Sequence, residues 1–188
     1  MAATPLTDAE AGDASRFGGK ASALARALQA GLPVPAGFAV DWRALERLDS
    51  AADDDRAELA TRFAELGGPV AVRSSALDED SAGASFAGQH ATFLNVAGVD
   101  GMLDALRDVW RSAATSAALA YRRHLGLSAP PRMAAVVQRL VPADVAGVLF
   151  TCDPVTGAPG RWMVEASWGL GEAVVAGVVT PDHWTITP

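Results

Sequence analysis

The chain has 188 residues, of which 50% are hydrophobic and 20% charged, so it is globular, with enough residues for one core or two lobes that share a cleft. Its net charge of −7 disfavours nucleic acid as a partner, because nucleic-acid binders normally present a basic face. No apolar run approaches the roughly 20 residues that cross a bilayer, and the acidic N-terminus lacks the pattern of a signal peptide. These features predict a cytoplasmic protein with no membrane or nucleic-acid partner.

After a loose leader (1–15), the first clear pattern is an amphipathic helix with apolar positions from Ala21 to Leu28. It opens on Gly18-Gly19-Lys20, which places backbone donors and an ammonium group near the positive end of the helix dipole. This is one reading, and a plain helix entry with an exposed lysine is the other. The spacing is not that of a Walker A loop.

The next segments favour an extended strand over 32–40 and two short helices over 42–48 and 59–66. Three aspartates at 53–55 lie between the helices. Consecutive carboxylates rarely converge on one ion, so we expect a solvated loop or a helix cap there.

The stretch 70–96 reads as two strands, 70–72 and 92–96, joined by a loop of small and polar residues. The first strand is expected to deliver Arg73 and the hydroxyls of Ser74 and Ser75 into this loop, where they can hold an anion. A polar hairpin loop with a surface arginine is the alternative.

Further along, the pattern predicts a long helix over 102–125 and strands over 134–141, 146–151 and 162–166. Interleaved helices and strands with late hairpins indicate an α+β, or mixed α/β, class. The single cysteine, Cys152, excludes an internal disulfide and is expected to be buried. The three histidines lack the spacing of a zinc site.

Seven motifs, in this order, resemble one family. They are GGKA at 18–21, PVPAGF at 33–38, AVRSSA at 71–76, EDSAGASFAGQHATFLNV at 79–96, VVQRLV at 136–141, AGVLFTCDPVTG at 146–157 and EASWGLGEAVVAGVVTPD at 165–182. The family comprises phosphoenolpyruvate synthase, pyruvate phosphate dikinase and rifamycin phosphotransferase, and the resemblance is to its N-terminal ATP-binding domain. It implies an ATP-grasp fold, a two-lobed clamp around ATP. It also implies that ATP phosphorylates a histidine on another domain, which passes the phosphoryl group to pyruvate or to a drug hydroxyl.

The resemblance also implies roles for particular residues. Lys20 and Arg73 match the family's catalytic contacts to the nucleotide phosphates. The loop that closes over the phosphates corresponds to Ser85, Phe86, Ala87, Gly88 and Gln89. On the adenine side, Gln138 and the backbone of Arg139 and Leu140 fall on the strand between the lobes. Glu172 lies in a loop beside the nucleotide and is either a ribose contact or structural.

The chain also departs from the family. Ala117 stands where relatives usually carry an arginine that contacts phosphate, and the segment 41–68 is short. The family's ligands for Mg²⁺, which accompanies ATP, and its histidine phosphocarrier domain are expected beyond Pro188, so no metal ligand is assigned here. We expect one nucleotide-binding unit with lobes near 1–130 and 131–188, and self-association through an uncovered C-terminal edge. A non-catalytic module that binds nucleotide weakly or docks a partner remains the alternative.

Overall fold

The structure, a computed structural model, describes residues 1–48, 50, 53–77, 91–115, 119 and 131–187. It contains two compact units, Met1–Leu140 and Val141–Pro188. Each unit holds one antiparallel sheet together with helices, so the predicted mixed α+β class is confirmed. None of the helices in the described ranges is long and apolar enough to cross a membrane.

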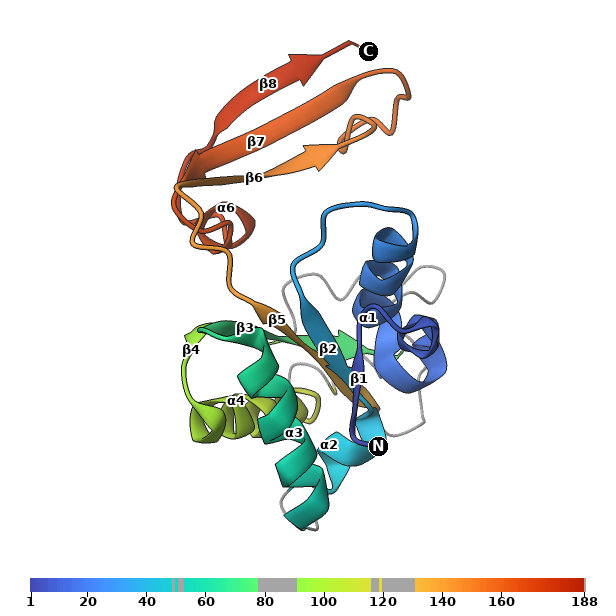
Figure 1. Cartoon of the computed structure of the whole chain (residues 1–188). Coiled ribbons are helices and arrows are strands. Elements are labelled where there is room, and N and C mark those ends of the chain that lie inside the picture. Colours follow the sequence, from blue (N-terminus) through green and yellow to red (C-terminus); the bar gives the residue numbers. More distant parts are fainter. Residues whose placement is uncertain (49, 51–52, 78–90, 116–118, 120–130, 188) are drawn as a thin grey trace. The chain divides into compact units, whose positions relative to one another are not determined.

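The first unit is built on a five-stranded sheet in the order β1-β2-β5-β3-β4, in which every neighbouring pair is antiparallel. The strands are β1 (Ala3–Pro5), β2 (Gly37–Val40), β3 (Val70–Ala76), β4 (Thr92–Val96) and β5 (Met133–Arg139). The sequence places β5 in a lobe 131–188, but the strand lies in the middle of this sheet (Figure 1). It belongs to the first unit because it pairs with both β2 and β3.

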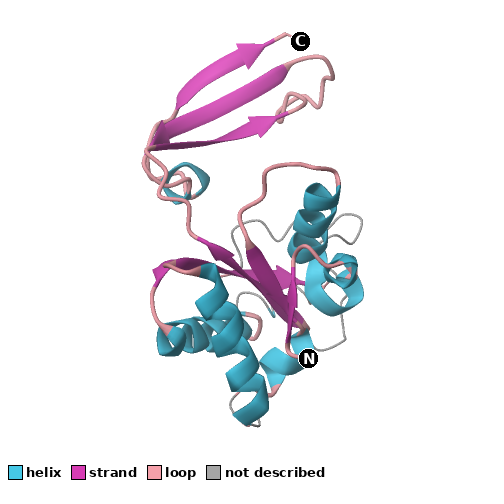
Figure 2. Ribbon diagram, viewed as in Figure 1, coloured by secondary structure: helices cyan, strands magenta, loops and turns pink. Residues whose placement is uncertain are grey.

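Helices cover both faces of this sheet (Figures 1 and 2). One face packs against α2 (Trp42–Glu46), α3 (Asp53–Leu66) and α4 (Val99–Ser112). Their apolar residues form the larger core with alternate residues of the strands, including Val70, Val72, Ala135 and Val137. The opposite face packs against α1 (Ala14–Gln29) and the short 3-10 helix η1 (Ala9–Gly12), in a smaller core around Phe17, Ala21 and Val136.

The helix α1 is interrupted near its start. Asp13 caps its first turn by accepting a hydrogen bond from the Ser15 N–H at 2.9 Å. Gly18 then adopts φ 76° and ψ 174°, so regular helix resumes only at Gly19. A Cβ at Gly18 would lie 2.2 Å from the Ser75 carbonyl oxygen on β3, so only glycine fits this contact.

Several predicted boundaries differ from the observed ones. The leader contains β1 and η1, and β1 was missed because a three-residue edge strand gives too short a pattern. Of the loop or helix cap expected at the aspartates 53–55, the loop is wrong, because these residues begin α3, in agreement with the preference for acidic residues in a first helical turn. Of the helix predicted over 102–125, α4 accounts for the part up to Ser112, while 116–118 and 120–130 lie outside the described residues.

The second unit is a three-stranded antiparallel sheet in the order β6-β7-β8 with one short helix. Its elements are β6 (Val145–Phe150), β7 (Trp162–Trp168), α6 (Glu172–Val175) and β8 (Asp182–Ile186). The strand β8 was not predicted. None of the described residues in this unit is buried, because a sheet of three strands with one helical turn cannot enclose a core.

The prediction that Cys152 is buried is wrong, since the residue is exposed just after β6. One sheet face is apolar, with Leu149, Trp168 and Trp184 exposed by 52%, 80% and 49%. The edge strands are β6 and β8. Self-association through an uncovered edge of this C-terminal sheet stays a prediction.

The edge strand β1 is tied to α3 by one carboxylate. Glu58 accepts hydrogen bonds from the N–H groups of Ala2 and Ala3 at 2.8 and 3.2 Å. We expect Glu58→Ala to lower the free energy of unfolding by about 1–3 kcal/mol, because two backbone donors lose a charged acceptor. Urea denaturation measures this. Glu65→Ala on the same helix is the control, because it removes only an exposed ion pair with Arg62 and should change the free energy of unfolding by less than about 0.5 kcal/mol. Equal effects of the two substitutions would show that the Glu58 hydrogen bonds do not stabilise the attachment of β1 to α3.

A second prediction concerns the close approach of α1 to β3. Gly18→Ala should destabilise the protein by at least about 2 kcal/mol more than Gly31→Ala. Gly31 is the control because its φ of 78° matches that of Gly18, but its Cβ would meet nothing within 4 Å. The difference in urea midpoint therefore isolates the contact with Ser75. Similar costs for both variants would mean that β3 yields to the added methyl group.

Candidate functional site

The start of regular helix in α1 is joined to β3 by a buried hydrogen bond. The Ala21 N–H donates to the Ser75 hydroxyl at 3.1 Å, and Ser75 is 0% exposed. At the same place Gly18 packs directly on the Ser75 backbone. Two motifs that lie more than fifty residues apart in the sequence, Gly18-Gly19-Lys20 and Arg73-Ser74-Ser75, therefore meet in space.

Arg73 lies on the face of the sheet that carries α1. It pairs with Val136 across β3 and β5, and directly opposed residues in an antiparallel pair point to the same side. Val136 belongs to the core formed with Phe17 and Ala21 of α1. Lys20 of α1 and Arg73 of β3, both half-buried, therefore lie on neighbouring elements on the same face of the sheet.

The predicted delivery of both serine hydroxyls to an anion is wrong. Side chains alternate along a strand, so Ser74 points to the opposite face, where its partner Ala135 belongs to the larger core. The Ser75 hydroxyl is on the α1 face but accepts the Ala21 N–H. Both serines lie within β3 and are buried.

The two arginines near α1 differ in their partners. Arg16 donates to Asp41 at 3.0 Å and also lies 3.4 Å from Glu10. The hydrogen bond to Asp41 raises the pKa of the Arg16 guanidinium above its ordinary value. By contrast, the Arg73 side chain makes no hydrogen bond or ion pair in the part of the chain that the structure describes. A half-buried guanidinium without a carboxylate is a natural anion ligand, since burial strengthens its attraction for negative charge.

The same sheet face continues along β5 to Gln138, which is 5% exposed and pairs with both Gly37 and Ala71. Its side-chain amide donates to the Pro35 carbonyl at 3.2 Å. Gln138 lies four residues along β5 from the partner of Ser75, or about 14 Å in an extended strand. That distance is on the scale of an extended nucleoside triphosphate.

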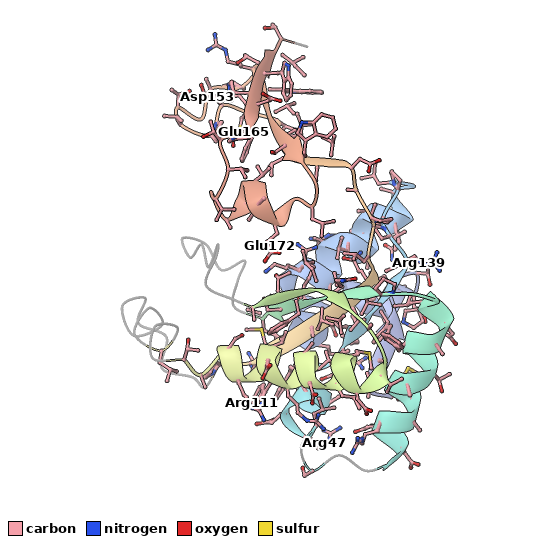
Figure 3. The ribbon with its side chains drawn as sticks, turned by 90° about the vertical axis from the view of Figure 1, so that its left-hand side faces the viewer. Arg47, Arg111, Arg139, Asp153, Glu165 and Glu172 are labelled. Atoms are coloured by element: carbon pink, nitrogen blue, oxygen red, sulfur yellow. The ribbon has the colours of Figure 1, made fainter. Side chains whose placement is uncertain are left out.

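The backbone after Gln138 is already engaged. The N–H groups of Arg139 and Leu140 donate to the carbonyls of Ala36 and Pro69 at 2.8 and 3.0 Å. The Arg139 side chain reaches the end of α3, where its Nε donates to the Leu66 carbonyl at 2.8 Å (Figure 3). An adenine held at these two residues would therefore have to use groups other than these N–H donors.

The remaining predicted residues lie outside the described residues or in the second unit. Ser85, Phe86, Ala87, Gly88 and Gln89 lie outside the described residues, as does Ala117. Glu172 is exposed at the first position of α6 in the second unit (Figure 3). Among the described residues, no three or more His, Cys, Asp or Glu side chains form a group that could hold a metal ion.

The sequence reading missed the roles of Gly18 and Ser75. The available signal was the pair Gly18-Gly19 at the head of an otherwise regular helical pattern, because glycine destabilises a helix and so suggests a turn or a close contact there. The identity of the contacting strand could not be read from that signal. It depends on the pairing of β3 with β5, which brings Ser75 beneath α1.

Comparison with known sequences identifies the family. The sequence profile described as pyruvate phosphate dikinase, AMP/ATP-binding domain, matches residues 45–188. Phosphoenolpyruvate synthase of Pyrococcus furiosus is 46% identical over 130 residues, which cover 69% of this chain and 16% of that protein. Prodigiosin synthesizing transferase PigC of Serratia marcescens is 39% identical over 197 residues, covering 91% of this chain and 22% of the relative.

A third relative bears on the N-terminal part. The probable phosphoenolpyruvate synthase of Archaeoglobus fulgidus is 35% identical over 228 residues, which cover 95% of this chain and 30% of that protein. The 5% of this chain that the match leaves uncovered amounts to fewer residues than the 19 that precede Lys20. The matched region therefore includes Lys20. The alignment is longer than the chain, so the relative has additional residues within the matched region. The chain spans less than a third of each of these relatives, and it belongs to the pyruvate phosphate dikinase AMP/ATP-binding domain family.

Proposed function

We propose that this chain binds ATP along the α1 face of the five-stranded sheet, as the nucleotide-binding part of a phosphoenolpyruvate-synthase-like phosphotransferase. The observation that carries the proposal is the meeting of the Gly18–Lys20 and Arg73–Ser75 motifs at one buried contact. Membership of an AMP/ATP-binding family supports the nucleotide as the ligand. In the finer form of the proposal the two units are the lobes of an ATP-grasp clamp.

Lys20 and Arg73 are proposed to hold the phosphates and to offset the charge that develops during transfer. Lys20 offers a compact ammonium group, while Arg73 offers a planar fork that can bind two phosphate oxygens at once. The loop Ser85–Gln89 is proposed to close over the phosphates through backbone donors. Lys20 and Arg73 belong to the end of the site near Ser75.

The adenine is proposed to lie toward Gln138, at the other end of the same face. Carbonyl groups of Arg139 and Leu140 suit this role better than their N–H groups, which already donate within the unit. Glu172 is proposed as a ribose contact or as a structural residue of the second unit.

The proposed reaction is transfer of a phosphoryl group from ATP to a histidine on another domain, for delivery to pyruvate or another hydroxyl acceptor. The contribution of this chain is to bind ATP and to orient its phosphates. Mg²⁺ would supply further neutralisation of the triphosphate, and no described residue is assigned to it.

The binding site is tested by titrating the protein with ATP and magnesium in a calorimeter. Lys20→Ala and Arg73→Ala should each weaken ATP binding by about 10- to 100-fold, because each removes a charge-assisted contact to phosphate. Arg111→Ala is the control. This exposed arginine of α4 pairs with Asp108 on the opposite side of the sheet (Figure 3). Undetectable binding at millimolar ATP, or equal affinity in all four proteins, would overturn the site.

Catalysis is tested separately from binding. Radiolabelled ATP, this chain and a separately expressed histidine phosphocarrier domain should give label on the histidine, and Arg73→Ala should abolish its transfer. Acid lability of the label identifies phosphohistidine. If ATP binds but no label moves, the chain is a binding module and the alternative role is correct.

A further inference from the structure

The start of regular helix in α1 lacks a cap from its own sequence. Gly18 occupies the N-cap position before Gly19 and has no side chain to accept a hydrogen bond. In an ordinary helix, the N-cap side chain accepts from the N–H of the second or third helical residue. Counting from Gly19, that third residue is Ala21.

The missing acceptor comes from a distant strand. The Ser75 hydroxyl accepts the Ala21 N–H at 3.1 Å, in the position that an N-cap serine of the helix would occupy. The Ser75 backbone fills the space where a side chain at position 18 would lie, with its carbonyl oxygen 2.2 Å and its hydroxyl oxygen 2.6 Å from a Cβ built there. Glycine at 18 and serine at 75 are therefore complementary parts of one contact.

This contact fixes the helix relative to the strand. A side chain cap within the helix would stabilise α1 without locating it on the sheet, whereas a cap from β3 does both. Lys20 lies in the capped turn, next to Ala21. Arg73 lies two residues before Ser75, on the same face of β3.

We propose that Ser75 is a positioning residue that sets the separation of Lys20 and Arg73 for phosphate binding. Without its hydroxyl, the Ala21 N–H loses its acceptor in a site closed to solvent, and the capped turn shifts or frays to recover one. Small displacements of charged ligands weaken binding steeply. The role in phosphate binding rests on the proposed function, whereas the capping itself does not.

The capping is tested without nucleotide. In Ser75→Ala, the Ala21 amide hydrogen should exchange with solvent at least about 10-fold faster, measured by NMR. Ser74→Ala is the matched control, since it is the same substitution one residue earlier and faces the opposite core. Unchanged exchange at Ala21 in Ser75→Ala would overturn the assignment of the cap.

The positioning is tested with two probes, ATP and adenosine, in NMR titrations. Ser75→Ala should weaken ATP binding by about 10-fold and leave adenosine within about 2-fold, because only ATP engages both cations. Ser74→Ala should change neither. A purely structural role predicts that Ser75→Ala lowers the affinity for ATP and for adenosine equally, and that result would overturn the proposal. Unchanged affinity for both ligands would overturn it as well.

Two further arms keep the outcomes distinct. Ser75→Cys keeps a side chain of the same length in bonds, with a somewhat larger sulfur atom that is only a weak acceptor, so it should show the same ATP-selective loss if Ser75→Ala does not fold. Loss of binding to both probes in folded Ser75→Cys counts against the proposal. Absence of ATP binding in the wild-type protein would instead remove the proposed function, with the exchange experiment still deciding the cap.

Discussion

The contact between the start of α1 and Ser75 of β3 determines how the first unit is arranged. A bare Gly18 Cα packs on the strand, and one turn later the Ala21 N–H finds its acceptor there. Both interactions are buried, and an unpaired N–H in that position would cost about 1–3 kcal/mol. The placement of α1 on the sheet, and with it the neighbourhood of Lys20 and Arg73, follows from this pair of interactions.

Side chains alternate along β3, so that one set faces the larger core and the other faces α1 and the proposed phosphate site. Val70, Val72 and Ser74 face the larger core with α2, α3 and α4. Arg73 and Ser75 face α1, where the apolar core is smaller and made largely of alanine side chains. Small side chains let the helix approach closely, while a register shift of one residue would bury Arg73 in the larger core. The register of β3 against β5 is therefore a condition for the site as much as for stability.

Much of this arrangement could be predicted from sequence. The apolar runs of β3, β4, β5, β6 and β7 and the 3.6-residue period of α1 and α4 are local signals, and each element is present. The short edge strand β1 and the strand β8 were missed. Asp182 and His183 in β8 interrupt the apolar pattern, and no residue of β8 is buried. Cys152 was expected inside because an apolar run precedes it, but the second unit has no buried residue among those described.

The site was harder to predict for a physical reason. Motifs indicated Lys20 and Arg73 separately, but their proximity depends on strand pairing and on a hydrogen bond between residues 21 and 75, which no local pattern encodes. The serines show the same limit. Ser74 and Ser75 are adjacent and chemically equal in the sequence, and only the strand geometry assigns one to the core and the other to α1.

The net charge of −7 raises the question of how such a chain would attract a triphosphate. At physiological ionic strength charges are screened over about 8 Å, so carboxylates elsewhere on the surface act weakly on a bound anion. What matters is the set of charges within that distance. Near α1, the carboxylates Glu10 and Asp41 are paired with Arg16, whereas the guanidinium of Arg73 has no carboxylate among the described residues. The acidic charge of the chain is thus compatible with a local cationic site, because Glu10 and Asp41 pair with Arg16 and not with Arg73.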